Sequence, residues 1–443
     1  MVMVSTPATA DTQVGLSDVE VLRIRNDFPV LDQEVNGKPL VYLDSGATSQ
    51  NPRSVLEAEQ EFYELRNAAV HRGAHHLAVQ ATDAFEDARA TVAGFIGVAE
   101  DELVWTANAT AGLNLLAYAF SNASVGTVRG EAGRFALGPG DEVLVTEMEH
   151  HANLIPWQEL CRRTGATLKF IPIDDDGALR LEEAARLITG RTKVLAFTHA
   201  SNVLGTINPV AELVRLARAA GSLVVLDACQ SAPHLPLDFK ALDVDFAVFS
   251  GHKMLAPTGI GGVYGRRELL NAMPPFLTGG SMITTVTMEK AEYLPAPQRF
   301  EAGTQPISQA VALAAAANYL RETGMERIAG WEASLGQRLV RGLSAIDGVR
   351  VVGPAAGVER LGLAAFDVAG VHAHDVGQYL DSMGIAVRVG HHCAQPLHRR
   401  LGLTATTRAS TYLYNTTEEV DLLLEAVAQV RPYFGVEGTG VSK

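Results

Sequence analysis

A lysine that directly follows a short apolar strand is the residue of this chain best suited to covalent chemistry. Residues 244–249 (VDFAVF) predict a buried strand, and Ser250, Gly251 and His252 then turn the backbone before Lys253. A lysine at the edge of a sheet can form a Schiff base with an aldehyde cofactor, which allows carbanion chemistry. The alternative is a solvated surface lysine, so the interpretation depends on other residues.

Three more residues could serve such a cofactor. Asp227 ends the apolar run 223–227 and can pair with a protonated pyridine nitrogen, or it caps a helix. Thr110 lies in the turn 109–112 that opens a predicted helix over 113–120, so it could hold a phosphate or act in an ordinary N-cap. His150 follows the strand that ends near Thr146 and could stack on a planar ring.

Short apolar runs must position these residues. The runs at 142–145, 168–171, 194–197 and 223–227 alternate with helical patterns at 156–164, 181–187 and 210–220. Such alternation predicts an α/β protein with a largely parallel, doubly wound sheet. Residues 121–140 are rich in small residues without clear periodicity and are interpreted as a surface insertion. No internal repeat is found.

The pattern changes after about Gln305. An Ala-rich helix over 310–323 precedes another helix and short strands near 362–367 and 385–389. We expect a smaller α+β domain of residues 16–44 and 305–435, a large domain of residues 45–304, and a disordered tail over 1–15.

Composition limits the possible functions. Among 443 residues, 47% are hydrophobic and 19% are charged, as is usual for a soluble enzyme. A net charge of -14 argues against nucleic acid as a partner, and no apolar run is long enough to span a membrane. The three cysteines are widely spaced and no signal peptide is recognised, so a cytoplasmic location is predicted.

Several longer segments share their residues and their order with one known family. They are AVHRG at 69–73, EHHAN at 149–153, SNVLGT at 201–206, SGHK at 250–253, RFEAGT at 299–304, RVGHHCA at 388–394 and RAS at 408–410. From about residue 27 to 433 the chain resembles the class V pyridoxal phosphate (PLP) enzymes, and within them the SufS-type, group II cysteine desulfurases. The resemblance implies PLP fold type I, with a mostly parallel mixed sheet flanked by helices in the large domain.

The resemblance also implies a role for individual residues. Lys253 would bind the cofactor covalently and His150 would stack on its ring. The remaining cofactor contacts would come from Asp227, Gln230, Thr110, Ser250 and His252, with Thr304 reaching the phosphate from the other subunit of a homodimer. The substrate L-cysteine would be bound through its carboxylate by Asn202 and Arg408, with Arg388 lining the same pocket.

Cys393 separates a desulfurase from an aminotransferase. Its thiolate would attack the sulfur of cysteine, become a persulfide and release L-alanine, supplying sulfur for iron-sulfur cluster assembly. His391, His392 and the nearby arginines would favour the thiolate. The alternatives are an unreactive loop or a metal site, but no CxxC or HxxxH pattern accompanies Cys393, and no metal site is predicted. Cys161 and Cys229 are interpreted as packing residues.

Two departures from the family pattern affect cofactor contacts and the domain junction. Many relatives have Thr-Thr-Glu-Gly where this chain has ATAG at 109–112, so the phosphate would depend more on Ser250 and His252. Gln305-Pro306 replaces the usual Pro-Asn and could alter the hinge into the small domain.

His374 is the candidate contact for a sulfur acceptor protein. In relatives that use a zinc-dependent SufU-type acceptor, a histidine at the matching position takes over a zinc coordination site. The alternative is a surface histidine that caps a helix over residues 375–383.

The scaffold alone does not determine the reaction. A selenocysteine lyase, which acts on L-selenocysteine, is the nearest alternative enzyme. A non-catalytic scaffold subunit of the iron-sulfur assembly machinery is the alternative from another class. Cys393 favours sulfur as the substrate, and the intact set of Lys253, Asp227 and Cys393 argues against a scaffold subunit.

Overall fold

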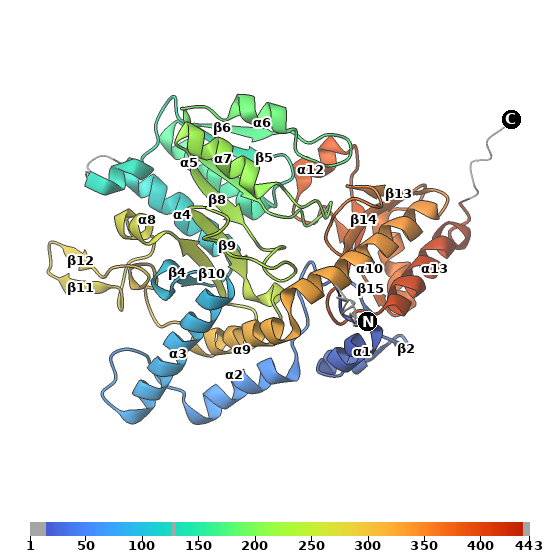
Figure 1. The fold of residues 1–443 in the computed structure, drawn as a ribbon, viewed down its shortest axis with the longest axis horizontal. Coiled ribbons are helices and arrows are strands. Elements are labelled where there is room, and N and C mark those ends of the chain that lie inside the picture. Colours follow the sequence, from blue (N-terminus) through green and yellow to red (C-terminus); the bar gives the residue numbers. More distant parts are fainter. Residues whose placement is uncertain (1–14, 126–129, 437–443) are drawn as a thin grey trace, which may run out of the picture.

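Seven buried strands form the central sheet of the protein. The computed structural model describes residues 15–125 and 130–436, so most of the predicted tail over 1–15 lies outside the described residues. The strands lie in the order β4-β10-β9-β8-β7-β5-β6 (Figure 1). Their bounds are β4 Leu103–Thr106, β5 Glu142–Thr146, β6 Thr167–Ile171, β7 Thr192–Thr198, β8 Leu223–Asp227, β9 Phe246–Ser250 and β10 Gly261–Gly265.

The predicted α/β sheet is confirmed. The pairs β9-β8, β8-β7, β7-β5 and β5-β6 are all parallel, and β10 runs antiparallel to both β9 and β4. Successive side chains of a strand point to opposite faces, so Val143 and Val145 join one core while Leu144 joins the other. Both faces must therefore be covered by helices, as parallel sheets require.

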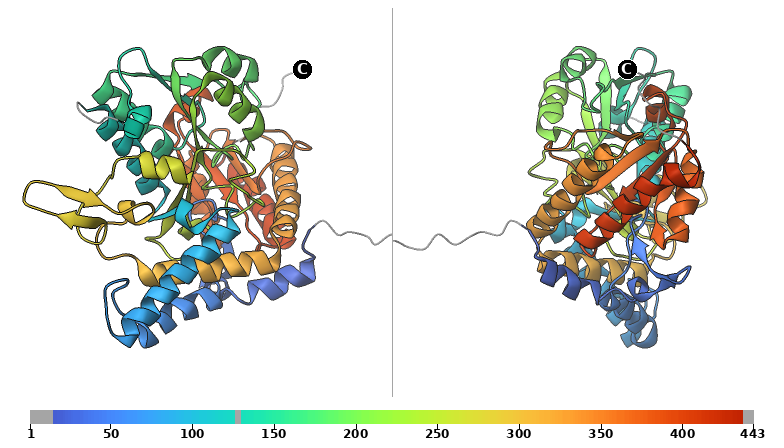
Figure 2. Two further views of the ribbon diagram at one scale, coloured as in Figure 1. Left: turned by 60° about the vertical axis from the view of Figure 1, so that its left-hand side comes forward. Right: turned by 90° about the vertical axis from the view of Figure 1, so that its right-hand side faces the viewer.

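Helices form a layer on each face of the sheet (Figures 1 and 2). The core on one face includes side chains of α4 (Ala109–Ser124), α5 (Ile155–Thr164) and α8 (Arg267–Ala272). The core on the other includes side chains of α2 (Arg53–Leu65), α3 (His76–Phe95), α6 (Leu181–Leu187), α7 (Val210–Ala220) and α9 (Ile307–Thr323). This arrangement leaves the carboxyl ends of β5, β7, β8 and β9 at one edge, where α/β proteins bind ligands.

A second, four-stranded sheet has the order β13-β14-β17-β16. Its strands are β13 Val349–Val352, β14 Leu363–Val368, β16 Arg388–Gly390 and β17 Thr406–Ser410, accompanied by α10 Met325–Ala345, α11 Ala373–Ser382, α12 Gln395–Arg400 and α13 Thr417–Tyr433. The N-terminal part of the chain joins this region, because β3 (Val41–Tyr42) pairs in parallel with β15 (Ile385–Ala386). Helix α1 (Asp18–Arg25) contacts it too, since Arg25 forms an ion pair with Glu419 of α13 at 2.8 Å.

Helix α9 lies with the large sheet, although the sequence analysis places it in the small domain. It packs against α2 and α3, whereas α10 packs against α13, β13 and β14. An Ala-rich helix is apolar on most sides, so its sequence pattern does not indicate which domain covers it. We propose that the boundary between the domains lies near Gly324, after α9.

The predicted insertion at 121–140 is partly wrong. Helix α4 continues through Ser124, with Ser121 and Ala123 buried, and residues 126–129 lie outside the described part of the chain. Phe135 is buried as well and stacks on Phe120 with ring centroids 5.2 Å apart. Small residues obscured the helical pattern there because Ser and Ala carry little apolar surface.

A two-stranded hairpin projects from the large domain, as the left view of Figure 2 shows. It consists of β11 (Ile283–Val286) and β12 (Ala291–Tyr293). The short strands β1 (Glu34–Val35) and β2 (Lys38–Pro39) form another hairpin near the N-terminus. Across residues 15–125 and 130–436, none of the helices combines the length and apolar character that a membrane span requires.

Candidate active site

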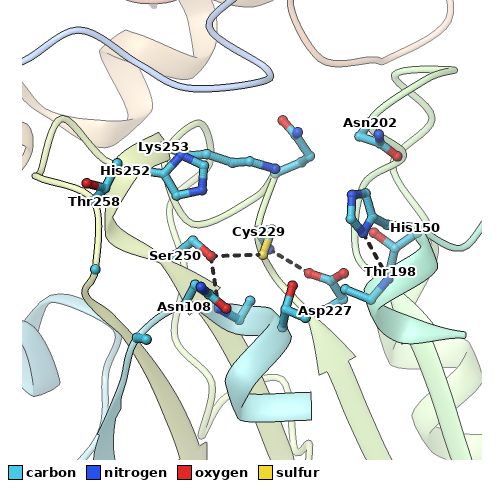
Figure 3. A pocket seen from close by; sticks show the side chains of 16 residues that line it. Asn108, His150, Thr198, Asn202, Asp227, Cys229, Ser250, His252, Lys253 and Thr258 are labelled. Atoms are coloured by element: carbon cyan, nitrogen blue, oxygen red, sulfur yellow. Dashed lines mark hydrogen bonds between the residues drawn. The ribbon is translucent and has the colours of Figure 1, made fainter. Parts of the chain in front are cut away.

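A cavity of about 330 Å³ opens at the carboxyl ends of β7, β8 and β9 (Figure 3). Its lining includes most of the predicted site residues, which come from separate segments of the chain: Thr110, His150, Asn202, Asp227, Gln230, Ser250, His252 and Lys253. Parallel strands bring these segments together because their carboxyl ends share one edge of the sheet.

A tight turn after β9 presents Lys253 to the cavity. The turn is the 3-10 helix Gly251–Lys253, and the amide of Gly251 donates to the carbonyl of Ile260 at 2.9 Å. A Cβ on Gly251 would come within 2.9 Å of the Ile260 side chain and 3.0 Å of its carbonyl oxygen. The position therefore requires glycine for the close approach to the next strand. The carbonyl of His252 accepts from the amide of Ser49 at 2.9 Å, which ties the turn to the N-terminal segment.

Asp227 and Gln230 both line the cavity. Asp227 is buried and its Oδ1 accepts from the amide of Cys229 at 2.9 Å. Gln230 donates from Nε2 to the carbonyl of Gly46 at 2.8 Å, while no group among the described residues bonds to its buried Oε1. A buried polar atom without a partner is costly, so this oxygen is available for a donor on a ligand.

The amino end of α4 faces the same cavity. Asn108 is its N-cap, and its Oδ1 accepts from the amide of Ala111 at 2.9 Å. Ser250 Oγ accepts from the amide of Ala109 at 2.9 Å, and Thr110 is exposed to the cavity. The partial positive charge of a helix N-terminus, with these hydroxyl groups and His252 nearby, suits a phosphate.

His150 is neutral in this environment. Burial and the neighbouring charge of Lys253 lower the pKa of His150 to about 4. Its Nδ1 accepts from the amide of Ala152 at 3.0 Å, which fixes the orientation of the ring beside the cavity. Burial also lowers the pKa of His252 to about 4, with the charge of Lys253 acting in the same direction. Neutral rings can pack against a flat ligand without the cost of burying a charge.

Arg408 approaches the site from the second sheet. It is fully buried on β17 and donates from Nη1 to the carbonyl of Asn202 at 2.9 Å and from Nη2 to Asp44 Oδ1 at 3.1 Å. Its Nε has no partner among the described residues. Arg388 of β16 is paired with Arg408 across the strands and is half-buried. Two neighbouring guanidinium groups with unused donors suit a carboxylate.

Asp44 also reaches the site, although no sequence motif pointed to it. Burial raises the pKa of Asp44, against the lowering effect of the charges of Arg408 and Arg388. The residue lies two positions after β3 and forms a bridge to Ser410, so it reaches the site from the N-terminal segment. Asp44 lies in no motif of the sequence, so it resembles any acidic loop residue there.

Cys393 lies on a loop beside the cavity and is half-buried. Its carbonyl accepts from the amide of His151 at 2.7 Å, and the carbonyl of His392 accepts from Asn202 Nδ2 at 2.7 Å. The structure thus brings the Cys393 loop to Asn202, which lines the cavity, and to His151, the neighbour of His150. Burial and the charge of Asp227 raise the pKa of the Cys229 thiol far above the ordinary value.

Two predicted residues lie elsewhere. Thr304 is exposed and lines a separate cavity of about 440 Å³, which shares only Ala107 and Gly259 with the first. His374 is exposed at the start of α11, but the N-cap is His372, whose Nδ1 accepts from the amide of His374 at 3.2 Å. The alternative role of His374 as the helix cap is therefore wrong.

Comparisons with known proteins agree with this geometry. The model of the class V aminotransferase family matches residues 41–423. A Mycobacterium leprae protein named probable cysteine desulfurase 2 is 55% identical over 96% of this chain and 100% of its own length. A cysteine desulfurase of Haloferax volcanii is 45% identical over 94% of this chain and 98% of its own.

Solved structures show the same fold. The apo cysteine desulfurase of Thermococcus onnurineus superposes with a TM-score of 0.86 at 38% identity, covering 94% of this chain and 98% of that protein. The cysteine desulfurase CsdA of Escherichia coli gives a TM-score of 0.83 at 37% identity, covering 93% and 98%. The chain belongs to the class V aminotransferase family and, within that family, to the cysteine desulfurases.

Proposed function

We propose that this protein is a PLP-dependent cysteine desulfurase that releases L-alanine from L-cysteine and retains the sulfur as a persulfide on Cys393. The observation that carries the proposal is the position of the Cys393 loop, which is bonded to His151 and to Asn202, and Asn202 lines the same cavity as Lys253 and Asp227. The relatives named as cysteine desulfurases support the same reaction.

The polar groups of the cavity fit pyridoxal 5'-phosphate. Asp227 would pair with the pyridine nitrogen, and the unpartnered Oε1 of Gln230 would accept from the ring hydroxyl. Lys253 would hold the aldehyde carbon and His150 would pack on the ring. The phosphate would be bound by Thr110, Ser250 and His252 at the amino end of α4. When bound, this cofactor stabilises negative charge on the α-carbon of the substrate.

The substrate carboxylate would bind the two arginines. Arg408 and Arg388 supply the positive charge, and Asn202 joins them through its carbonyl contact with Arg408. Bidentate binding fixes the amino acid so that the Nζ of Lys253 can accept the proton from its α-carbon. The side chain of the substrate then faces the rim, where Cys393 lies.

The sulfur transfer step balances without an external oxidant. The Cys393 thiolate attacks the sulfur of the bound cysteine, so an S–S bond forms while the bond between that sulfur and the β-carbon breaks. The electron pair of the broken bond remains on the β-carbon, which takes up a proton, and the α-carbon regains the proton held by Lys253 Nζ before L-alanine leaves. Arg408 lies close enough to Cys393 for the charges of the two groups to interact.

The proposed enzyme would be a homodimer, in which Thr304 would contact the phosphate bound by the other subunit. Its cavity of about 440 Å³ is separate from the Lys253 cavity of the same chain, so Thr304 is free to serve the phosphate of a second subunit. Most oligomers of identical chains are twofold symmetric, which would give two equivalent sites.

The SufS-type subtype, a cytoplasmic location and a role in iron-sulfur cluster assembly belong to the same proposal. Persulfide sulfur would pass to an acceptor protein, and the exposed side chain of His374 is available to meet a zinc-dependent SufU-type acceptor. If His374→Ala leaves acceptor-stimulated turnover unchanged, His374 does not serve this contact.

The test compares alanine production from L-cysteine under reducing conditions with added PLP. Wild type and Cys229→Ala, the matched control, are expected to produce alanine, and Cys393→Ala is expected to produce almost none. Equal activity of Cys393→Ala and wild type would refute the persulfide role. Activity of Cys393→Ala on L-selenocysteine, with wild type inactive on cysteine, would instead establish a selenocysteine lyase. A protein that binds no PLP would be a scaffold subunit.

A further inference from the structure

The Cys393 loop has an unusual backbone. His392 has a φ of 49° and Cys393 a φ of 57°, so two consecutive residues other than glycine occupy the left-handed region. Side chains with a Cβ rarely adopt this conformation, and such strain persists only where surrounding contacts stabilise it. The contacts on both sides of Cys393 must therefore hold the loop in place.

One residue holds the loop at two points. His151 donates its backbone amide to the carbonyl of Cys393 at 2.7 Å, and its ring Nε2 accepts from the backbone amide of Gln395 at 3.0 Å. The second bond requires a lone pair on Nε2, so the ring carries its proton on Nδ1. Burial, together with the charge of His391, lowers the pKa of His151, which favours the neutral ring that this bond needs.

The preceding part of the loop is held by buried rings. His392 Nε2 lies 2.9 Å from Thr406 Oγ1, and the same hydroxyl lies 3.1 Å from Nε2 of His398. Nδ1 of His398 faces the carbonyl of Ala394 at 3.0 Å and must donate to it. Nε2 of His398 therefore accepts from Thr406, whose oxygen accepts from Nε2 of His392. This side of the loop is fixed inside the protein, whereas the His151 side is half-buried.

His151 also connects the loop to the cavity. It directly follows His150, whose ring lines the Lys253 cavity. A second cavity of about 290 Å³ is lined by both histidines and shares Thr110, His150 and Ala152 with the first. The backbone that orients His150 thus also places the carbonyl of Cys393.

We propose that His151 is a positioning residue that keeps the Cys393 loop closed over the site, through the bond from the amide of Gln395 to its ring Nε2. The proposal rests on the function proposed above, because a closed loop brings the thiolate to the substrate sulfur. Opening of the loop relieves the strain at His392 and Cys393. Loss of the bond to His151 therefore shifts the equilibrium of the loop toward the open position. His151 touches neither substrate nor cofactor in this role.

The test measures the alkylation rate of Cys393 by iodoacetamide in the PLP-loaded protein. Peptide mass spectrometry separates Cys393 from Cys161 and Cys229. His151→Ala is expected to raise the rate about fivefold, the effect of one lost hydrogen bond on the opening equilibrium. In the same variant, kcat for alanine formation is expected to fall while KM for cysteine stays within about twofold, because only the geometry of attack changes.

Variants at both ends of the bond make the test specific. His151→Gln places an amide oxygen near the position of Nε2 and is expected to restore the wild-type rate. Gln395→Pro removes the donor at the first position of α12, where proline is tolerated, and is expected to match His151→Ala. Gln395→Ala keeps the backbone amide and is the matched control. In the double variant His151→Ala/Gln395→Pro, the alkylation rate of Cys393 is expected to equal that of either single variant.

The outcomes separate this proposal from the proposed function. If His151→Ala and Gln395→Pro are alkylated at the rate of Gln395→Ala, the role of His151 is refuted. If Cys393→Ala still forms alanine, the persulfide mechanism fails, but the alkylation rates still decide whether His151 holds the loop. A uniform loss of cofactor and thermal stability in every His151 variant, including His151→Gln, would indicate a structural role and would also overturn the proposal.

Discussion

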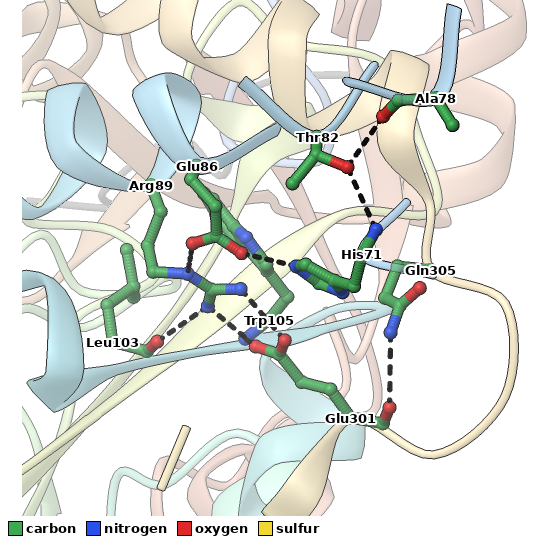
Figure 4. Close-up of polar contacts among 9 residues, drawn as sticks. All are labelled: His71, Ala78, Thr82, Glu86, Arg89, Leu103, Trp105, Glu301 and Gln305. Atoms are coloured by element: carbon green, nitrogen blue, oxygen red, sulfur yellow. Dashed lines mark hydrogen bonds and ion pairs between the residues drawn. The ribbon is translucent and has the colours of Figure 1, made fainter. Parts of the chain in front are cut away.

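Two fully buried arginines in this protein differ in how their donors are used. Arg89 of α3 bonds to both oxygens of Glu301 at 2.7 and 2.8 Å, to Glu86 at 2.8 Å and to the carbonyl of Leu103 at 2.9 Å (Figure 4). Arg408 bonds to the carbonyl of Asn202 and to Asp44, and its Nε has no partner in the described parts of the chain.

The pKa values of the two groups shift in opposite directions. Burial lowers the pKa of Arg89, but the charge of Glu301 and hydrogen bonds with Glu301 and Glu86 outweigh it and raise the pKa. Burial lowers the pKa of Arg408, and Asp44 offsets this only in part. Arg89 thus forms a structural ion pair in which its nitrogens are bonded to protein groups. Arg408, in contrast, keeps a nitrogen that can donate to a bound anion.

Removing the saturated arginine should have the largest effect on stability. Arg89→Met leaves the carboxylate of Glu301 buried without its partner, and we expect the free energy of unfolding to fall by about 3–5 kcal/mol. Urea unfolding measures the loss. The control is Arg162→Met, which breaks an exposed ion pair with Glu159 and is expected to cause no resolvable change. If Arg89→Met unfolds at the same urea concentration as wild type but is less active, Arg89 is not the structural counterpart of Arg408.

The corresponding change at the site should affect substrate rather than stability. Arg408→Lys keeps a positive charge but loses the planar fork, so we expect kcat/KM for L-cysteine to fall about 100-fold, which corresponds to about 3 kcal/mol. The melting temperature is expected to change little. Steady-state kinetics and thermal unfolding of the same sample test both statements, and an unchanged kcat/KM would remove Arg408 from the substrate site.

The acid sensitivity of the site should come from its buried histidines. Burial, followed by the charge of Arg408, lowers the pKa of His392 to about 2. Between that value and the ordinary pKa of about 6.5, the unfolded state binds a proton that the folded state does not, so stability falls as pH decreases. Between pH 7 and pH 5, we expect the free energy of unfolding of wild type to fall by about 2 kcal/mol more than that of His392→Gln. Equal losses in urea unfolding would show that His392 does not contribute.

The smallest effect on activity is expected for a substitution of Cys229. Cys229 lies in the cavity wall, with its Sγ 3.8 Å from Ser250 Oγ, and its raised pKa keeps it a thiol. Cys229→Ser should leave the rate of alanine formation within about twofold of wild type, since a neutral packing residue is replaced by one of similar size. A loss of tenfold or more would assign Cys229 a chemical role and weaken the distinction between the two cysteines.

The sequence predicts the regular part of this molecule well. Strand β8 and helices α6 and α7 have the predicted bounds, because their apolar spacing matches the period of each structure. We expected helix α9 in the small domain, yet it packs against α2 and α3, because a run of alanines carries no pattern that indicates which domain covers it. The end of α4 was missed because small residues gave no periodic signal.

The site is less predictable than the sheet. Residues in continuous motifs, such as Lys253 and His150, could be placed in one site because those motifs resemble a known family. Asp44 and the two bonds made by His151 depend on the contact between the two sheets, which no local pattern encodes. The unused donors and acceptors of Arg408 and Gln230 are likewise visible only when the neighbouring backbone is in place.

The most direct test of the proposed reaction is the mass of the peptide that contains Cys393 after incubation with L-cysteine and trapping by an alkylating reagent. The account predicts one additional sulfur atom on Cys393 and none on Cys161 or Cys229, with alanine formed in equal amount in the first turnover. Alanine formation without added sulfur on Cys393, or sulfur on another cysteine, would contradict it.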